Sequence, residues 1–223
     1  MKKNRHQGIL NYVLFQKNMD YNKLATREVV TKTAVALKAN GVEALVVENS
    51  AAALEKIKEL IPQGASVMNG SSATLEQIGY IDYLASGKPG WNNLKAAILS
   101  EKDPAKQQTL RLQATLSDYY LGSVHALTET GEFIIASNTG SQLSHIVFTS
   151  PNLIFVVSTK KIVPTLAVAF KRLEEYVFPI EDKSIMEKFQ RHTMLSKIVI
   201  FKRENKMLGR KVRLILVNED LGF

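Results

Sequence analysis

The stretch from Asn152 to Tyr176, NLIFVVSTKKIVPTLAVAFKRLEEY, decides the fold because it joins a strand to a helix. Its first seven residues are almost continuously apolar, which is typical of a strand buried on both faces of a parallel sheet. The remainder, from Lys160 onward, predicts a helix with Pro164 in its first turn, where the missing N–H of proline is tolerated. The stretch therefore predicts one strand–turn–helix unit.

The first third of the chain repeats this alternation. Apolar residues at helical spacing between positions 22 and 40 end at Gly41, where a helix C-cap is expected. A second helix begins with Ser50 as its cap, and a third follows a glycine-serine turn with Ser72 or Thr74 as its N-cap. Further along, Asp103 caps a predicted helix that has Pro104 at its first position. Strands are predicted at Val42–Val47, Ser66–Met68, Leu121–Leu127 and Leu153–Val157. The pattern predicts an α/β fold, a mostly parallel sheet with helices on both faces.

Further strand signals lie toward the C-terminus. EFIIAS, residues 132–137, follows a hairpin signal, ETG. KIVIFKR (197–203) and KVRLILVNE (211–219) predict an antiparallel pair that closes one edge of the sheet near the C-terminus. With no internal repeat and no linker, we expect one domain over residues 1–223, with 1–21 as an N-terminal extension or helix.

Composition limits the function classes. The chain has 223 residues, of which 45% are apolar and 22% charged, as in ordinary globular proteins. It has no cysteine, which excludes disulfides, cysteine-ligated zinc, iron–sulfur clusters and a thiol nucleophile within the chain. Apolar runs fall short of the ~20 residues that span a bilayer, and the N-terminus lacks a cleavage signal. We expect a cytoplasmic protein without a membrane span.

The formal charge is +8, and residues 183–213 hold ten Lys or Arg against two acidic residues. Such a segment predicts a solvated basic face that attracts small anions or an acidic protein partner. No nucleic-acid-binding signature accompanies it, although a basic interaction or nucleic-acid module remains an alternative.

Three strand-to-helix turns are candidate ligand sites, because ligands of open α/β sheets bind beyond the carboxyl ends of the strands. They combine small hydroxyl and amide side chains with glycines and a lysine, a combination suited to a carboxylate or phosphate. The alternative is that each turn only caps a helix. The candidate ligand-binding residues are Gly70, Ser71, Ser72, Thr74, Asn138, Thr139, Gly140, Ser141, Gln142 and Lys160.

His125 and Glu129 are the candidate catalytic residues, since a histidine before a hairpin can serve as an acid–base group near neutral pH. The commoner alternative for such a histidine is a buried structural residue that is hydrogen-bonded to its neighbours. We expect both at the mouth of the cleft that holds the polar turn. No histidine pair has metal-ligand spacing, so no metal is expected. Ser123, Ser137 and Ser141 lack a GxSxG context, and no Walker A or GxGxxG pattern occurs.

Four stretches together resemble the LUD-domain family, of the lactate-utilization protein C type. They are VMNGSSATLEQIG, SDYYLGSVHALTETGEFIIASNTGSQLS, LIFVVSTKKIVPTLAVAFKRLEEYVFPIED and GRKVRLILVNEDLGF, and the resemblance runs from about Leu24 onward. It implies a fold like that of ribose-phosphate isomerases, glucosamine-phosphate deaminases and CoA transferases.

The resemblance also implies a role in bacterial oxidation of lactate to pyruvate, alongside partner proteins that carry iron–sulfur clusters. A chain without cysteine holds no such cluster, so redox chemistry would lie in those partners, and no cofactor is expected here. The family supplies no set of catalytic residues to carry over. A stand-alone sugar-phosphate isomerase or CoA-transferase-like enzyme is the alternative, although fold analogy alone does not license it.

Overall fold

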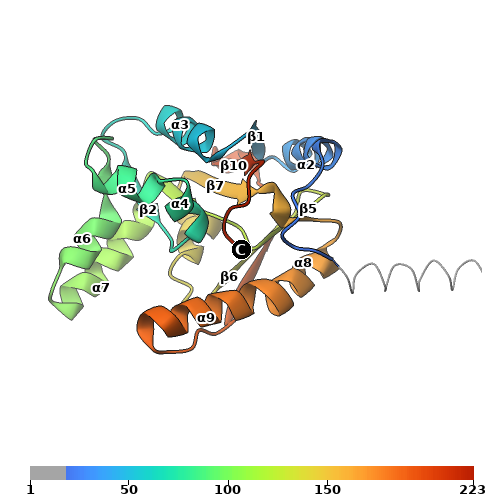
Figure 1. Cartoon of the computed structure of the whole chain (residues 1–223). Coiled ribbons are helices and arrows are strands. Elements are labelled where there is room, and N and C mark those ends of the chain that lie inside the picture. Colours follow the sequence, from blue (N-terminus) through green and yellow to red (C-terminus); the bar gives the residue numbers. More distant parts are fainter. Residues whose placement is uncertain (1–18) are drawn as a thin grey trace, which may run out of the picture.

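The computed structural model describes residues 19–223, so almost all of the expected N-terminal extension, residues 1–21, lies outside the described residues. The main sheet of this part has six strands in the order β1-β10-β7-β4-β2-β3, and every neighbouring pair is parallel (Figure 1). The strands are β1 (Glu43–Val47), β2 (Ser66–Asn69), β3 (Asn92–Asn93), β4 (Tyr119–Gly122), β7 (Asn152–Ser158) and β10 (Lys211–Val217).

A second, mixed sheet has the order β8-β5-β6-β9. Its strands are β5 (Ala126–Thr128), β6 (Phe133–Ser137), β8 (Ile162–Val163) and β9 (Lys197–Phe201). The predicted hairpin joins β5 to β6, and β9 pairs antiparallel with β6 as an edge strand. An antiparallel edge therefore does occur near the C-terminus, but in the second sheet.

Helices occupy most of the connections. The α-helices are α2 (Arg27–Ala39), α3 (Ser50–Leu60), α4 (Ala73–Gln77), α5 (Tyr80–Ala85), α6 (Leu94–Ser100), α7 (Pro104–Gln113), α8 (Leu166–Arg172) and α9 (Phe178–Phe189). Short 3-10 segments are η1 (Ala114–Leu116), η3 (Thr159–Lys161) and η5 (Lys206–Leu208), and π-helical segments are η2 (His145–Thr149) and η4 (Leu173–Val177). Helices α8, η4 and α9 run on without a break.

The main sheet is buried on both faces, because alternate residues of its central strands face different layers. On one face, Ile154, Val156 and Ile215 pack with apolar residues of α3, α4 and α5. On the other face, Phe155 and Leu214 pack against α2 and the second sheet. The apolar run of β7 is thus explained, and the predicted α/β fold with helices on both faces is confirmed.

The second sheet separates the main sheet from α8 and α9 (Figure 1). Phe133 of β6 faces the main sheet, where its ring lies 5.7 Å from that of Phe155. Ile134, the next residue, faces away from it and packs with Val168 and Leu173 of the α8–η4 helix. One strand therefore contributes to two cores, and the molecule stacks helix, sheet, sheet and helix.

The predicted strand Leu121–Leu127 is wrong as one strand. The chain leaves the main sheet after Gly122 and enters the second sheet at Ala126, where the His125 N–H already bonds to Ile134 O at 3.0 Å. Both halves are apolar and buried, so periodicity alone gives no sign of the break. The other three predicted strands match β1, β2 and β7 within one residue at each end.

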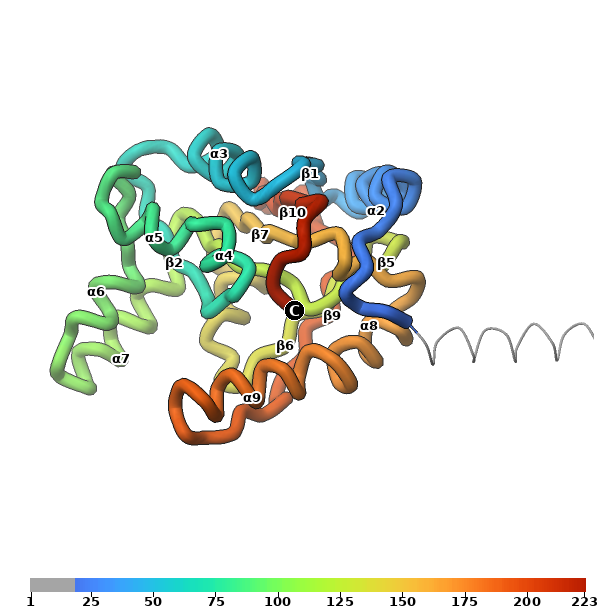
Figure 2. The backbone as a smooth tube through the Cα atoms, in the orientation of Figure 1, coloured from blue at the N-terminus to red at the C-terminus, as the bar shows by residue number. Residues whose placement is uncertain are grey.

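The predicted antiparallel pairing of residues 197–203 with 211–219 is also wrong. β10 lies between β1 and β7 and is parallel to both, with Leu214 opposite Ala44 and Phe155. Figure 2 shows the chain passing from β10 toward α4, whose Gln77 side chain accepts a hydrogen bond from the Gly222 N–H at 2.6 Å. Proximity in sequence suggested the wrong partner, because sheet order depends on long-range packing.

Caps match the sequence in part. Ser72 caps α4, Asp103 caps α7, and Gly41 follows α2 with φ +81°. The cap of α3 is Asn49 rather than Ser50, which is the first helical residue. The helix predicted from Lys160 begins only at Leu166, because Ile162 and Val163 pair with β5 as β8.

Candidate functional site

A cleft of about 610 Å³ lies beyond the carboxyl ends of β2, β4 and β6, and α9 and its neighbours form its far wall. Of the ligand-binding residues expected from the sequence, it brings together Gly70, Ser71, Ser72, Thr74, Asn138, Thr139, Ser141 and Gln142. Gly140 and Lys160 do not line it. Turns from two different sheets therefore meet at one site, as the carboxyl-edge argument predicted.

The polar turn from Ser137 to Gln142 uses most of its side chains to hold its own shape. Ser137 Oγ accepts a hydrogen bond from the Gly140 N–H at 3.0 Å, and Thr139 Oγ1 donates to Ser141 Oγ at 3.0 Å. Gln142 Nε2 donates to Ala136 O at 3.0 Å, and its Oε1 accepts from the Tyr120 hydroxyl at 3.1 Å. The turn is therefore held by its own hydrogen bonds, and few of its donors remain available to a ligand.

The glycine-serine turn faces it across the cleft. A Cβ on Gly70 would lie 2.7 Å from Tyr120 Oη and 2.9 Å from Gln142 Oε1, so only glycine lets the two turns approach. Ser72 Oγ accepts from the Leu75 N–H at 3.3 Å and is therefore a capping group. Ser71 is exposed, and within the described part of the chain its hydroxyl has no protein partner.

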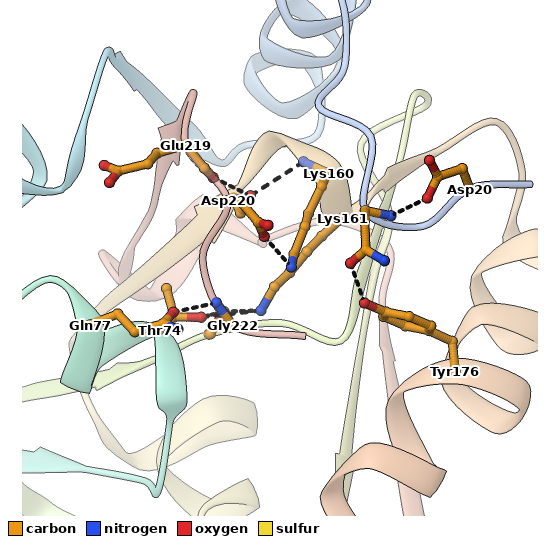
Figure 3. A network of polar contacts seen from close by, with 12 residues as sticks. Asp20, Thr74, Gln77, Lys160, Lys161, Tyr176, Glu219, Asp220 and Gly222 are labelled. Carbon is orange, nitrogen blue, oxygen red and sulfur yellow. Dashed lines mark hydrogen bonds and ion pairs between the residues drawn. The ribbon is translucent and has the colours of Figure 1, made fainter.

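The lysine that reaches the cleft is Lys161, whereas the sequence pointed to Lys160. Lys160 forms an ion pair with Asp220 away from the cleft lining. Lys161 places its Nζ 3.2 Å from Thr74 Oγ1 (Figure 3). The same Nζ lies 3.0 Å from Ser123 Oγ. Neighbouring side chains of the 3-10 turn η3 point in different directions. Lys160 therefore meets Asp220, whereas Lys161 meets the cleft.

Lys161 is buried, with 3% of its surface exposed, and forms no ion pair within residues 19–223. Burial, followed by the positive charges of Arg172 and Lys160, lowers the pKa of its amine well below the ordinary value. A Cβ on Gly222 would lie 2.3 Å from Thr74 Oγ1 and 3.0 Å from Lys161 Nζ. The backbone at Gly222 therefore closes over the amine.

His125 lines the cleft together with Asn138, as predicted. Its Nδ1 accepts a hydrogen bond from the Ala136 N–H at 3.1 Å, so the neutral ring carries its proton on Nε2. Burial, with Lys161 and Arg172 nearby, lowers the pKa of His125 to about 3. The ring is thus a neutral hydrogen-bond donor near neutral pH rather than a titrating acid–base group.

The prediction that Glu129 shares this cleft is wrong. Glu129 lies beyond the other end of β5, where its carboxylate forms an ion pair with Lys32 of α2 at 2.8 Å. Its N–H bonds to Val163 O at 2.9 Å, and it is absent from the cleft lining. Adjacency to His125 in the sequence was misleading, because β5 separates the two side chains along its length.

Arg172, which lies behind the cleft at His125, and Glu181, which lines the cleft, are residues that the sequence did not indicate. Arg172 is fully buried, donates from Nη1 to His125 O, and stacks its guanidinium 5.2 Å from the ring of Tyr176. Glu181 of α9 lines the cleft, and burial raises the pKa of its carboxyl. An arginine within the apolar run LAVAFKR was the one available signal, since buried arginines are rare.

The basic segment from Lys183 to Arg213 is mostly exposed, and Lys188 and Arg191 line the cleft. Arg210 and Arg213 are the exceptions, with side chains 7% and 12% exposed. Arg210 donates to Val147 O at 2.7 Å and Ile146 O at 2.8 Å, so it is a structural residue. The solvated face predicted from charge is confirmed for the other eight basic residues.

Residues 19–223 lack two features. No cluster of three His, Asp or Glu side chains in this part could hold a metal ion. None of its helices combines the length and the apolar character needed to cross a bilayer.

Comparison with known proteins agrees with this architecture. A DUF162 family protein from Deinococcus radiodurans has a similar structure, with a TM-score of 0.53 at 13% identity. The match covers 88% of this chain and 100% of that chain, and at this identity it shows the fold alone. No curated protein matches the chain.

The family model of the LUD domain matches residues 30–194, which is most of the chain, and β10 lies beyond the match. The chain therefore belongs to the LUD domain family.

Proposed function

We propose that the chain binds a small anionic metabolite, a carboxylate or a phosphate, in the cleft and acts in lactate or related organic-acid utilization. The observation that carries this proposal is Lys161, a buried amine at the cleft without a carboxylate partner in the described residues. Arg172 behind it also lacks an ion-pair partner there. Neither basic group pairs with the two carboxylates that line the cleft, Glu76 and Glu181, so the missing countercharge favours an anion beside Lys161.

The binding mode follows from the lowered pKa of Lys161. An arriving anion supplies the missing countercharge, so the amine takes up a proton and becomes a charged donor. Charge-assisted hydrogen bonds are about twice as strong as neutral ones. The Ser71 hydroxyl and the Nε2–H of His125 add neutral donors around the same space. We expect anion binding to be coupled to proton uptake.

Calorimetry in two buffers of different ionisation enthalpy tests this proposal with lactate, pyruvate and inorganic phosphate as probes. For a probe that binds, wild type should take up as much as one proton per anion. The uptake should occur at pH values between the pKa of Lys161 in the free protein and its higher pKa in the complex. Lys161→Met should weaken binding by about ten- to a hundredfold, the loss of one charged contact, and abolish the proton uptake.

Lys160→Met is the matched control, because it removes a neighbouring lysine that is paired with Asp220 outside the cleft lining. It should retain the proton uptake. Equal affinity of wild type and Lys161→Met for every probe that binds would contradict the proposal, and so would the absence of binding by all three.

The redox chemistry of such a pathway would lie in partner proteins that carry iron–sulfur clusters, since this chain has no cysteine. The exposed basic segment suits an acidic partner. Reversing charge at Lys202, Arg203 and Lys206 together should lower the association rate with a purified iron–sulfur oxidoreductase from the same pathway, most strongly at low salt. An unchanged rate would count against this face as the docking site. A stand-alone isomerase or CoA transferase is the alternative, and turnover by the purified chain without partner proteins would favour it.

A further inference from the structure

The cleft contains a hydroxyl and an amine whose arrangement the anion proposal does not use. Ser123 follows β4 at the point where the chain crosses between sheets, and it lines the cleft with a partly exposed side chain. The distance from Lys161 Nζ to Ser123 Oγ is 3.0 Å. Thr74 Oγ1 lies 3.2 Å from Lys161 Nζ and 3.4 Å from Ser123 Oγ. The accessible group is the hydroxyl, and the buried group is the base.

We infer that Ser123 and Lys161 form a nucleophile–base dyad that acts on the ester or thioester of a small acyl group. A nucleophile within hydrogen-bond reach of a base that a third group orients is the arrangement required for covalent catalysis. Serine–lysine pairs provide this chemistry on unrelated folds, so the pair is recognised by geometry and not by a GxSxG motif. Thr74 is a positioning residue that holds the amine toward Ser123.

The environment of Lys161 suits a base. Burial, Arg172 and Lys160 favour the neutral amine, whose lone pair can accept the hydroxyl proton. The charges that act on the Lys161 amine are those of Arg172 and Lys160, and Lys160 pairs with Asp220. Two carboxylates, Glu76 and Glu181, also line the cleft, and neither forms an ion pair with Lys161 in the described residues. The Nε2–H of His125, which has no protein partner in residues 19–223, is a neutral donor in the same cleft for the developing oxyanion.

The reaction balances without an additional reagent. Ser123 Oγ forms a bond to the acyl carbon while its proton passes to Lys161 Nζ. The bond from that carbon to the alcohol or thiol breaks, and the Lys161 ammonium returns the proton to the leaving group. Water then attacks the acyl-enzyme, gives a proton to Lys161, and releases the carboxylic acid as Ser123 Oγ regains a proton.

The first test is covalent labelling. Wild-type protein treated with phenylmethanesulfonyl fluoride should gain one sulfonyl group, which peptide mass spectrometry should locate on Ser123. Ser123→Ala should lose this label, whereas Ser100→Ala, which removes an exposed serine of α6 outside the cleft, should keep it. Labelling of another serine, or of Ser123→Ala at the wild-type rate, would overturn the dyad.

The second test separates the base from a merely structural lysine. Hydrolysis of p-nitrophenyl acetate should fall about a hundredfold or more in Lys161→Arg, which retains a charged donor but has no lone pair to accept the proton. The wild-type rate should rise with pH through the pKa of Lys161, and this dependence should disappear in the variant. Retention of both rate and pH dependence in a folded Lys161→Arg protein would refute the assignment.

The outcomes distinguish this inference from the proposed function, on which it does not rest. The two readouts are separate in the wild-type protein, since calorimetry measures anion binding and mass spectrometry measures acylation of Ser123. Anion binding without acylation of Ser123 therefore defeats the dyad alone. Acylation of Ser123 without anion binding defeats only the proposed metabolite site.

Discussion

Gly131 in the β5–β6 hairpin shows what a single backbone position demands. It has φ +84°, and a Cβ there would lie 2.9 Å from the backbone of Ala36 and Leu37 in α2. Gly64 has a similar φ of +79° but no atom within 4 Å of such a Cβ. A side chain at Gly64 would therefore meet backbone strain alone, whereas one at Gly131 would meet both strain and steric overlap.

We expect Gly131→Ala to lower the free energy of unfolding by about 2–5 kcal/mol, from left-handed strain plus overpacking against α2. Gly64→Ala should cost only the strain, about 1–2 kcal/mol. Urea denaturation of both variants measures the difference. Equal losses would mean that the hairpin turn moves away from α2 at little cost.

His145 is a second residue-scale case, a buried imidazole 2% exposed and stacked 4.8 Å from the Tyr120 ring. Burial lowers its pKa to about 4, from about 6.5 in the unfolded chain. Above pH 6.5 both states are neutral, so its contribution to stability is complete. As pH falls from 6.5 to 4 the unfolded state binds the proton first, and stability declines by up to about 1.4 kcal/mol per pH unit.

His145→Gln should therefore make the free energy of unfolding less dependent on pH between 4 and 6.5. The slope should fall by up to about 1.4 kcal/mol per pH unit, which corresponds to one proton. His125, whose pKa is lowered to about 3, should account for part of the slope that remains. Urea denaturation at several pH values gives the two slopes. Parallel curves for wild type and variant would show that His145 is protonated in the folded state.

At the scale of elements, Arg210 joins the segment before β10 to the end of the helical turn after β6. Its guanidinium donates to the carbonyls of Ile146 and Val147 and lies 3.9 Å from the Glu204 carboxylate. Carbonyls at a helix end lack intrahelical partners, so the arginine supplies donors that the backbone does not.

Arg210→Met should lower the free energy of unfolding by about 2–4 kcal/mol, because it leaves Glu204 and these carbonyls without their donor. Lys211→Met is the matched control, since Lys211 is the next basic residue and is exposed. It should change stability by about 0.5 kcal/mol or less. Chemical denaturation decides between them, and a small loss for both would place Arg210 with the solvated basic residues.

At the scale of the whole molecule, β10 holds the main sheet together, although it comes last in the chain. Ile215 is fully buried between β1 and β7 and belongs to the core beneath α3. Val46 of β1, the edge strand, is 52% exposed.

Ile215→Ala should therefore cost about 2–5 kcal/mol, as a cavity in a packed core, whereas Val46→Ala should cost less than about 1 kcal/mol. Thermal and urea unfolding measure both. A small loss at Ile215 would fit the antiparallel edge strand that the sequence suggested, and would contradict the central position of β10.

The sequence by itself determined the elements whose causes are local. Apolar runs predicted β1, β2 and β7. Asp103 and Ser72 marked the starts of helices, and Gly41 marked the end of one. These signals are local, because hydrophobic periodicity and capping depend on residues a few positions apart. It also indicated that the turns around Gly70 and Asn138 meet, since carboxyl ends of strands share an edge.

Only the tertiary structure decided which groups those turns present to the cleft. Local sequence does not say which lysine of a KK pair turns inward, so Lys161 took the place expected for Lys160. For the same reason, local sequence did not predict the buried position of Arg172. It also did not predict the crossing between sheets that brings Ser123 to Lys161. Burial, pairing and pKa depend on residues distant in the chain, and these contacts exist only once β4, β7 and the C-terminal segment have packed together.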